Sequence, residues 1–253
     1  MDRSFHETGC FSNSASAIKS VKVKSLLARS GLRFSLTIYL VGGIVVLAGL
    51  IAVILAAAAG DGRSSSVIPD YAGVPSAWQN RHILGDPDAP VTVQAWEDFR
   101  CPACAAFNQR VKPGLLENYI VSGKVKLEFR HFPLQQHEPG ASLAAQASEC
   151  AADQGRFWTY HDRVFQATSS GPSAFLMERL IEYAVELEMD GDTFTSCLTN
   201  QTHLLTISES LQAARAAGHN STPTVLVDGV PVANPLDYEA VSASIENQLS
   251  SSQ

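Results

Sequence analysis

The stretch VTVQAWEDFRCPAC, residues 91–104, decides the fold class of this 253-residue chain. It begins with a short run of β-branched and aromatic residues, which is typical of a strand. After Cys101 the apolar residues recur at helical spacing, so the stretch predicts a strand that runs directly into a helix. Pro102 suits the first turn of that helix, where its missing N–H costs nothing, whereas Pro113 predicts a break further along.

The motif Cys101-Pro102-Ala103-Cys104 places two cysteines one turn apart at the start of this helix. The unpaired N–H groups and the positive end of a helix stabilise a thiolate, so the pKa of Cys101 should fall from about 8.5 toward the range of about 3.5–7. Cys104 should be buried and act as the resolving thiol. The motif therefore predicts thiol-disulfide exchange, with the Cys101–Cys104 disulfide as the redox-active group and no other cofactor.

A CxxC pair can also hold a structural zinc ion, which is the alternative chemistry for this motif. Structural zinc sites usually use four ligands, commonly supplied by two such pairs. The remaining cysteines of the domain, Cys150 and Cys197, lie far from one another and from the CxxC in the sequence. The spacing therefore favours redox chemistry, and no metal site is predicted.

The rest of the domain predicts a mixed α/β architecture with helices covering a central sheet. Residues 124–132 alternate as a second strand, and residues 139–218 are Ala-rich and amphipathic, which indicates an all-helical insertion. Residues 222–232 predict two short strands around Asp228-Gly229, a dipeptide that suits a type I′ turn. An amphipathic helix follows, and the folded domain is placed at residues 78–250.

The N-terminal part predicts a membrane anchor. Residues 34–60 carry no charge, and about 20 apolar residues suffice to cross a bilayer, so residues 34–59 are interpreted as a transmembrane helix. The Ser-rich leader, residues 1–33, has six basic and two acidic residues, which predicts a disordered cytoplasmic segment. Residues 60–77 read as a flexible linker. A cleavable signal peptide is the alternative, although the apolar run exceeds the usual length.

This topology places the catalytic domain outside the cytoplasm. Residues 64–253 have 11 basic and 22 acidic residues, which argues against nucleic acid as a partner. Four of the five cysteines lie in the exported part, where an oxidising compartment permits two disulfides. The remaining one, Cys10, lies in the leader.

The domain resembles the DsbA-like family of thioredoxin-fold proteins over about residues 80–250. The resemblance rests on five motifs in order: WEDFRCPAC (96–104), RHFPL (130–134), ECAADQGRFWTYHDRVF (149–165), FTSCL (194–198) and TPTVLVDG (222–229). It implies a thioredoxin fold interrupted by a helical domain. It also implies that Cys101 is the nucleophile and Cys104 the resolving cysteine. Pro223 would be a cis-proline facing them, and Thr222 would bind an extended substrate backbone.

Two further expectations come from the same resemblance. Cys150 and Cys197 match positions of a second, structural disulfide in some members, with two separate buried thiols as the alternative. Many thioredoxin-fold enzymes carry a buried acid six residues before the first cysteine, where this chain has Ala95. Glu97 and Asp98 are nearer to the motif, and the sequence leaves open whether either exchanges protons with Cys104.

Histidines and aromatic residues of the domain are assigned mainly structural roles. A lone histidine at a strand end, such as His131, is more often structural than catalytic. Four others show no joint spacing that would bind a metal: His137, His161, His203 and His219. The aromatic residues Phe157, Trp158 and Phe165 are predicted to belong to the core of the helical insertion.

The predicted function is therefore a membrane-anchored thiol-disulfide oxidoreductase that forms disulfides in exported polypeptides. A membrane redox partner would recycle the CxxC. Two alternatives remain: a reductase or isomerase running the same cycle in another direction, and a non-enzymatic metal-binding or chaperone module that uses the cysteines structurally.

Overall fold

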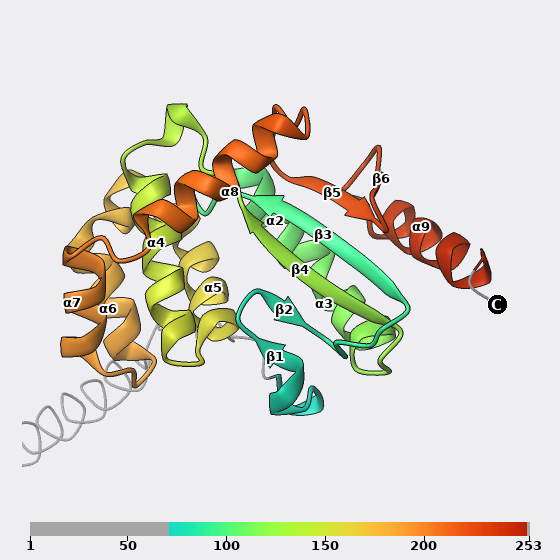
Figure 1. The fold of residues 1–253 in the computed structure, drawn as a ribbon, viewed down its shortest axis with the longest axis horizontal. Helices are drawn as coiled ribbons and strands as arrows, with labels where there is room; N and C mark the ends of the chain where they lie inside the picture. The colour runs from blue at the N-terminus through green and yellow to red at the C-terminus, as the bar shows by residue number, and fades with distance from the viewer. Residues whose placement is uncertain (1–70, 252–253) are drawn as a thin grey trace, which may run out of the picture. The chain divides into compact units, whose positions relative to one another are not determined.

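The computed structural model describes residues 71–251, which lie within one compact unit. At its centre is a six-stranded sheet with the order β1-β2-β4-β3-β5-β6 (Figure 1). β3 and β4 are parallel, and the other neighbouring strands are antiparallel. The strands are β1 (Gln79–Asn80), β2 (Ile83–Leu84), β3 (Val91–Glu97), β4 (Val125–His131), β5 (Thr224–Val227) and β6 (Val230–Pro231).

The two central strands follow the alternation seen in the sequence. In β3, Val91, Val93 and Ala95 are buried, while the residues between them are half-buried. The register pairs Val93 with Leu127 of β4, so the apolar residues of both strands lie on one face of the sheet. This face carries the main core.

Three helices pack on that apolar face: α2 (Pro102–Arg110), α3 (Lys112–Leu115) and α9 (Tyr238–Ser251). In Figure 1, α2 and α3 lie behind the central strands, whereas α8 (Leu204–Ala216) crosses in front of their upper end. α8 covers a smaller cluster around Trp96 and Leu226. The predicted break is present: α2 ends at Arg110, and Pro113 lies in the first turn of α3.

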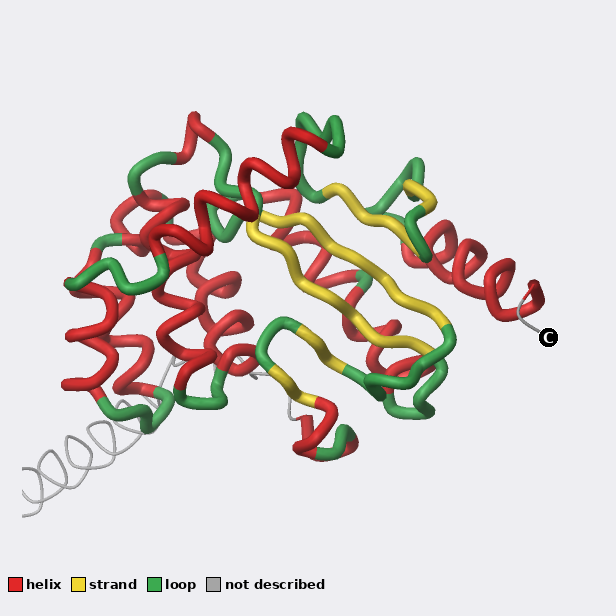
Figure 2. Tube along the Cα trace, viewed as in Figure 1, coloured by secondary structure: helices red, strands yellow, loops and turns green. Residues whose placement is uncertain are grey.

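The predicted helical insertion is confirmed, because α-helices and short 3-10 turns fill the chain between β4 and β5. Besides α8, it contains α4 (Gly140–Asp153), α5 (Phe157–Gln166), α6 (Met177–Glu186) and α7 (Gly191–Thr199). Figure 2 shows these helices gathered at one end of the sheet. Small side chains such as Ala144 and Ala147 are fully buried, so α4 can pack closely against its neighbours.

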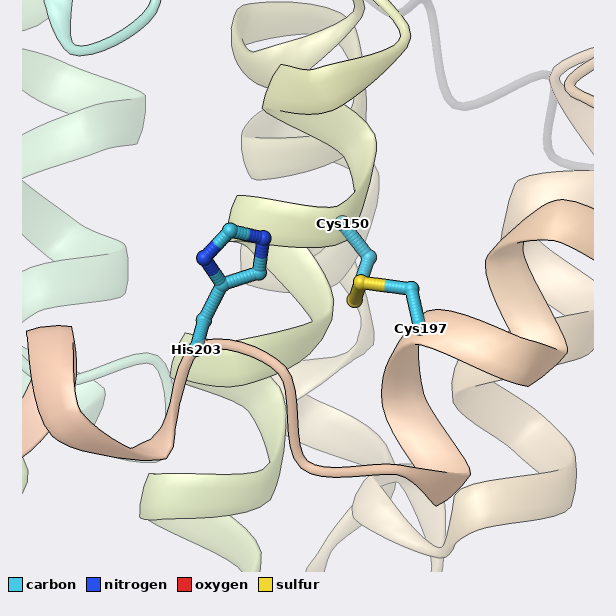
Figure 3. A group of neighbouring side chains, drawn as sticks. All are labelled: Cys150, Cys197 and His203. Atoms are coloured by element: carbon cyan, nitrogen blue, oxygen red, sulfur yellow. A yellow bond between two sulfur atoms is a disulfide. The ribbon is translucent and has the colours of Figure 1, made fainter.

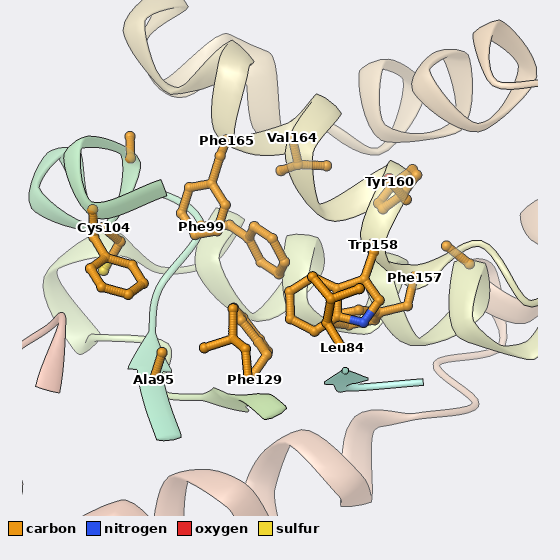
Figure 4. Close-up of a cluster of buried hydrophobic side chains, with 14 of the residues drawn as sticks. Leu84, Ala95, Phe99, Cys104, Phe129, Phe157, Trp158, Tyr160, Val164 and Phe165 are labelled. Atoms are coloured by element: carbon orange, nitrogen blue, oxygen red, sulfur yellow. The ribbon is translucent and has the colours of Figure 1, made fainter. Parts of the chain in front are cut away.

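An aromatic cluster joins the insertion to the sheet (Figure 4). Phe99, which follows β3, stacks on Phe129 of β4 with ring centroids 5.3 Å apart. The ring centroid of Phe99 also lies 4.8 Å from that of Phe165 in α5. The predicted core residues Phe157 and Trp158 are buried in the same cluster. Each buried aromatic ring contributes about 150–250 Å² of surface, so the two parts share one core.

The hairpin between β5 and β6 has the predicted turn. Asp228 and Gly229 both have positive φ, at 46° and 81°. A type I′ turn requires positive φ at both central residues, which explains why this dipeptide occupies the position.

The N-terminal boundary of the domain needs correction. Tyr71 and Val74 belong to the predicted flexible linker, but they are buried in the main core, so the folded part starts before residue 78. The predicted leader 1–33 and span 34–59 lie outside the described residues. Within residues 71–251, no helix has the length and apolar character needed to cross a membrane.

Candidate active site

The CxxC lies where the sequence placed it, at the junction of β3 and α2. Cys101 is the N-cap residue of α2, and Pro102 occupies the first turn. Both cysteines are free thiols and buried: Cys101 is 7% exposed and Cys104 is 0% exposed. Pro102 is the exposed residue of the motif, and Ala103 is half-buried.

The pKa of Cys101 is lowered to about 5, from an ordinary value of 9.0. The largest cause is the hydrogen bond from the Cys104 thiol. The backbone N–H groups of Ala103 and Cys104, at the start of α2, act in the same direction and outweigh the effect of burial. Cys101 is therefore a thiolate at neutral pH and can act as a nucleophile.

The pKa of Cys104 moves the opposite way and lies well above its ordinary value. Burial is the main cause, followed by the hydrogen bond that Cys104 gives to Cys101 and by the negative charge of Glu97. Two thiols one turn apart thus have different protonation states, which is what a nucleophile and a resolving thiol require.

The Thr222-Pro223 loop faces the nucleophile, although 121 residues separate it from Cys101. The peptide bond between Thr222 and Pro223 is cis. The Sγ atom of Cys101 lies 3.5 Å from the carbonyl oxygen of Thr222, which accepts a hydrogen bond from the protonated thiol. The structure thus brings together the four residues singled out for catalysis and substrate binding: Cys101, Cys104, Thr222 and Pro223.

Glu97 supplies a buried carboxyl group next to the CxxC. Its side chain accepts a hydrogen bond of 2.6 Å from Asn108 Nδ2, and the same amide donates to the carbonyl oxygen of Cys104 at 3.0 Å. Burial raises the pKa of Glu97 to about 8, against the opposing effects of the Lys112 charge and the Asn108 hydrogen bond. Glu97 is therefore mostly protonated at neutral pH. Sequence reasoning missed Asn108, whose only signal is a polar residue four positions after Cys104 on a buried helix face.

Asp98 has a different role, because its carboxylate organises the loops around the motif. One oxygen accepts from the backbone N–H of Arg100 at 2.7 Å. The other accepts from the backbone N–H of Leu134 at 2.9 Å and lies 2.7 Å from His137 Nδ1. With these contacts made, Asp98 holds the chain entering Cys101 against the segment that follows β4.

His131 makes its side-chain hydrogen bond away from the thiols. Its Nε2 atom lies 2.7 Å from Glu149 Oε1 on α4, and burial lowers the pKa of the imidazole. The ring is therefore neutral at neutral pH, and its hydrogen bond to Glu149 links the end of β4 to α4.

Cys150 and Cys197 form a disulfide that connects α4 to α7, with their Cα atoms 5.9 Å apart. Figure 3 shows the His203 ring, from the segment between α7 and α8, beside this bond. His203 Nε2 lies 2.6 Å from a carboxylate oxygen of Asp153, one turn further along α4. The bond lies within the helical insertion, apart from the CxxC.

A family model described as thioredoxin matches residues 78–247 of the chain. The chain belongs to the thioredoxin family. Its DsbA-like character follows from a relative named probable disulfide bond formation protein D, from Bacillus anthracis. That relative is 30% identical over 176 residues, covering 68% of this chain and 80% of the relative.

A solved structure is similar to this thioredoxin-family chain over 68% of its length. BdbD from Bacillus subtilis, in its oxidised form, has a TM-score of 0.63 and 27% identity, with 68% of this chain and 94% of BdbD covered. A different kind of relative is the Na(+)/H(+) antiporter NhaA 3 of Salinispora tropica, at 33% identity over 172 residues. The chain spans only 25% of that antiporter's length.

Proposed function

We propose that the chain is a membrane-anchored thiol-disulfide oxidoreductase that forms disulfides in exported polypeptides. The observation that carries the proposal is the CxxC at the start of α2, with Cys101 facing Thr222 and Cys104 buried one turn deeper. In this arrangement the pKa of Cys101 is lowered to about 5 and the pKa of Cys104 is raised. A stabilised Cys101 thiolate stabilises the reduced enzyme, so the Cys101–Cys104 disulfide becomes a stronger oxidant. This supports the oxidising direction.

The catalytic cycle starts from the oxidised CxxC. A substrate thiolate attacks the sulfur of Cys101, a substrate–Cys101 bond forms, and the Cys101–Cys104 bond breaks with Cys104 leaving as a thiolate. A second substrate thiolate then attacks the substrate sulfur of the mixed disulfide and displaces Cys101. The substrate is oxidised by two electrons and the CxxC is reduced. The low pKa of Cys101 makes it a good leaving group in the second step.

Glu97 would supply the proton that the first step requires. Its pKa of about 8 keeps the carboxyl protonated at neutral pH, while the pKa of Cys104 is far above that value. Proton transfer from Glu97 to the leaving Cys104 thiolate is therefore downhill. The Asn108 amide donates to the carboxyl group of Glu97 and to the backbone carbonyl of Cys104, and so holds Glu97 in position as the proton donor. This arrangement replaces the acid that is absent at Ala95.

Thr222 and Pro223 would bind the substrate as an extended backbone beside Cys101. Strand addition of this kind recognises the main chain and therefore accepts many sequences. It suits an enzyme whose substrates share only reduced cysteines.

Residues 34–59 would anchor this domain, with the basic leader in the cytoplasm and residues 60–253 outside. In that compartment the reduced CxxC must pass its electrons to a membrane redox partner after each turnover. The charge asymmetry across residues 34–59 is the observation that supports this topology.

The test is the oxidation of a reduced model protein by the full-length chain, combined with a redox titration against glutathione. Oxidation that disappears in Cys101→Ser, with a potential nearer −120 mV than about −270 mV, is the expected result. A potential near the lower value would show a reductase. Oxidation unaffected by Cys101→Ser would overturn the proposal.

A further inference from the structure

A second cluster of chemically active side chains lies outside the CxxC. It consists of His82, between β1 and β2; His131, at the end of β4; and Glu149, in the middle of α4. Their ligand atoms all lie within 4.8 Å of one another. We infer that His82, His131 and Glu149 form a binding site for a divalent transition-metal ion, with Zn²⁺ the best fit.

The two imidazoles point the same atom at one carboxylate oxygen. His131 Nε2 lies 2.7 Å from Glu149 Oε1, and His82 Nε2 contacts the same oxygen. Two nitrogen ligands and one carboxylate oxygen, with a fourth position left for water, form a known zinc ligand set. Ligand atoms of a tetrahedral zinc site lie about 3.3 Å apart, given bonds of about 2.0–2.1 Å. Binding therefore requires Glu149 Oε1 to move away from both imidazole nitrogens, because both contacts are shorter than this spacing.

The surroundings hold these ligands in place. Arg81 donates to the other carboxylate oxygen, Glu149 Oε2, at 2.6 Å, which leaves Oε1 for the ion. Outer hydrogen bonds of this kind orient carboxylate ligands in metal sites. The His82 ring packs edge-on against Phe157 with centroids 4.9 Å apart, and the His131 ring against Phe129 at 5.0 Å. Both rings therefore turn their Nε2 edges toward Glu149.

The site has an entry route. His82 and His131 line a cavity of about 280 Å³, together with Trp96, Arg130 and Ser210 among others. The side chain of His82 is 27% exposed, whereas that of Glu149 is 0% exposed. The cavity thus lets an ion reach the two imidazole rings and leaves space for a water ligand there.

A competing ligand set nearby is excluded in the oxidised protein. Cys150, Cys197 and His203 also lie within 4.8 Å of one another, but both sulfurs are committed to the disulfide. A disulfide sulfur is not the thiolate that zinc binds. In the part of the chain that the structure describes, this leaves His82, His131 and Glu149 as the set with free ligand atoms.

The experiment uses the full-length, tag-free chain carrying Cys10→Ser, Cys101→Ser and Cys104→Ser, so that no free thiol competes. After treatment with a chelator, Zn²⁺ is titrated against a chromogenic chelator, and Co²⁺ binding is followed by its d–d absorption. We expect one ion per chain and no sulfur-to-cobalt charge-transfer band. His82→Ala and Glu149→Gln should each weaken binding by about 100-fold or more, since outer-shell changes alone cost about 10–100-fold.

His203→Ala is the matched control, because this histidine also pairs with a carboxylate of α4 but lies outside the site. It should leave Zn²⁺ affinity unchanged. Glu149→Gln changes a fully buried side chain and could unfold the chain, so the decisive variant is His82→Ala, at a partly exposed position. Zn²⁺ should raise the melting temperature of the parent but not that of His82→Ala. Absence of stoichiometric binding, equal binding by His82→Ala, or tighter binding of Ca²⁺ than of Zn²⁺ would each overturn the inference.

Discussion

The protein carries two pairs of cysteines in different surroundings. Cys101 and Cys104 belong to one helix terminus and are free thiols, whereas Cys150 and Cys197 are 47 residues apart and joined between two helices. In the first pair, the hydrogen bond from Cys104 lowers the pKa of Cys101 and burial raises the pKa of Cys104, so the two values separate. The second pair lies in the helical insertion and closes a loop. Cysteine thus serves disulfide exchange in the CxxC and covalent cross-linking of two helices in the insertion, because the surroundings of the two pairs differ.

The largest effect should come from removing the nucleophile. We expect Cys101→Ser to lower the rate of disulfide exchange by at least about 10³-fold, because Cys104 is buried and protonated and cannot replace it. The measurement is oxidation of a reduced model protein by the full-length chain. Cys104→Ser is the companion variant, and it should accumulate a mixed disulfide through Cys101. Retained activity in Cys101→Ser would remove the distinction between the two pairs.

Removing the second pair should affect stability and spare the chemistry. The variant Cys150→Ala/Cys197→Ala should lose about 4 kcal/mol of unfolding free energy in the chain-entropy model for a loop of this length. Urea unfolding of the full-length protein measures the loss. Under conditions where the variant remains folded, its exchange rate should equal that of the parent. A large fall in rate would mean that the second pair also takes part in electron transfer.

The acid beside Cys104 should affect a single step. Glu97→Gln keeps the shape and the hydrogen bond from Asn108 but removes the transferable proton, so the exchange rate at pH 7 should fall by about 10²-fold. Stopped-flow kinetics from pH 6 to pH 9 should show a decline near pH 8 in the parent that is lost in the variant. Glu128→Gln, at a half-buried position of β4, is a suitable control. An unchanged pH profile in Glu97→Gln would exclude the carboxyl from proton transfer.

A further prediction concerns stability as a function of pH. Folding lowers the pKa of Cys101 from 9.0 to about 5, so its contribution to the stability of the reduced protein is complete above pH 9 and is lost as the pH falls through 5. The unfolding free energy of the reduced parent, relative to Cys101→Ser, should therefore rise between these values. Cys150 and Cys197 are joined in a disulfide and do not titrate, so they add no pH dependence to the unfolding free energy. A difference in unfolding free energy that does not change with pH would contradict the lowered pKa of Cys101.

Local patterns were enough to predict much of this fold. Alternation in residues 91–96 marked β3, the proline after Cys101 marked the start of α2, and Asp228-Gly229 marked a hairpin turn. These features depend on neighbours within a few residues, so they can be read without knowing the tertiary structure. The two-residue strands β1 and β2 were missed because they are too short to show alternation.

Sequence patterns were less informative about the surroundings of the thiols. Ala95 suggested that a proton donor is absent, yet Glu97 takes a buried position beside Cys104, and Asn108 of α2 holds it there. His82 went unnoticed as a candidate ligand because His131 and Glu149 lie far from it along the chain.

The order of the elements from β3 onward, the position of the CxxC at a helix start and the presence of a helical insertion follow from residue patterns, since short-range propensity and burial specify them. The protonation states of Cys101 and Cys104, the partner of Glu97 and the convergence of His82 and His131 on Glu149 depend on packing between distant segments. Burial and charge act through space, and the folded chain brings together groups whose distance along the sequence carries no information about their contact.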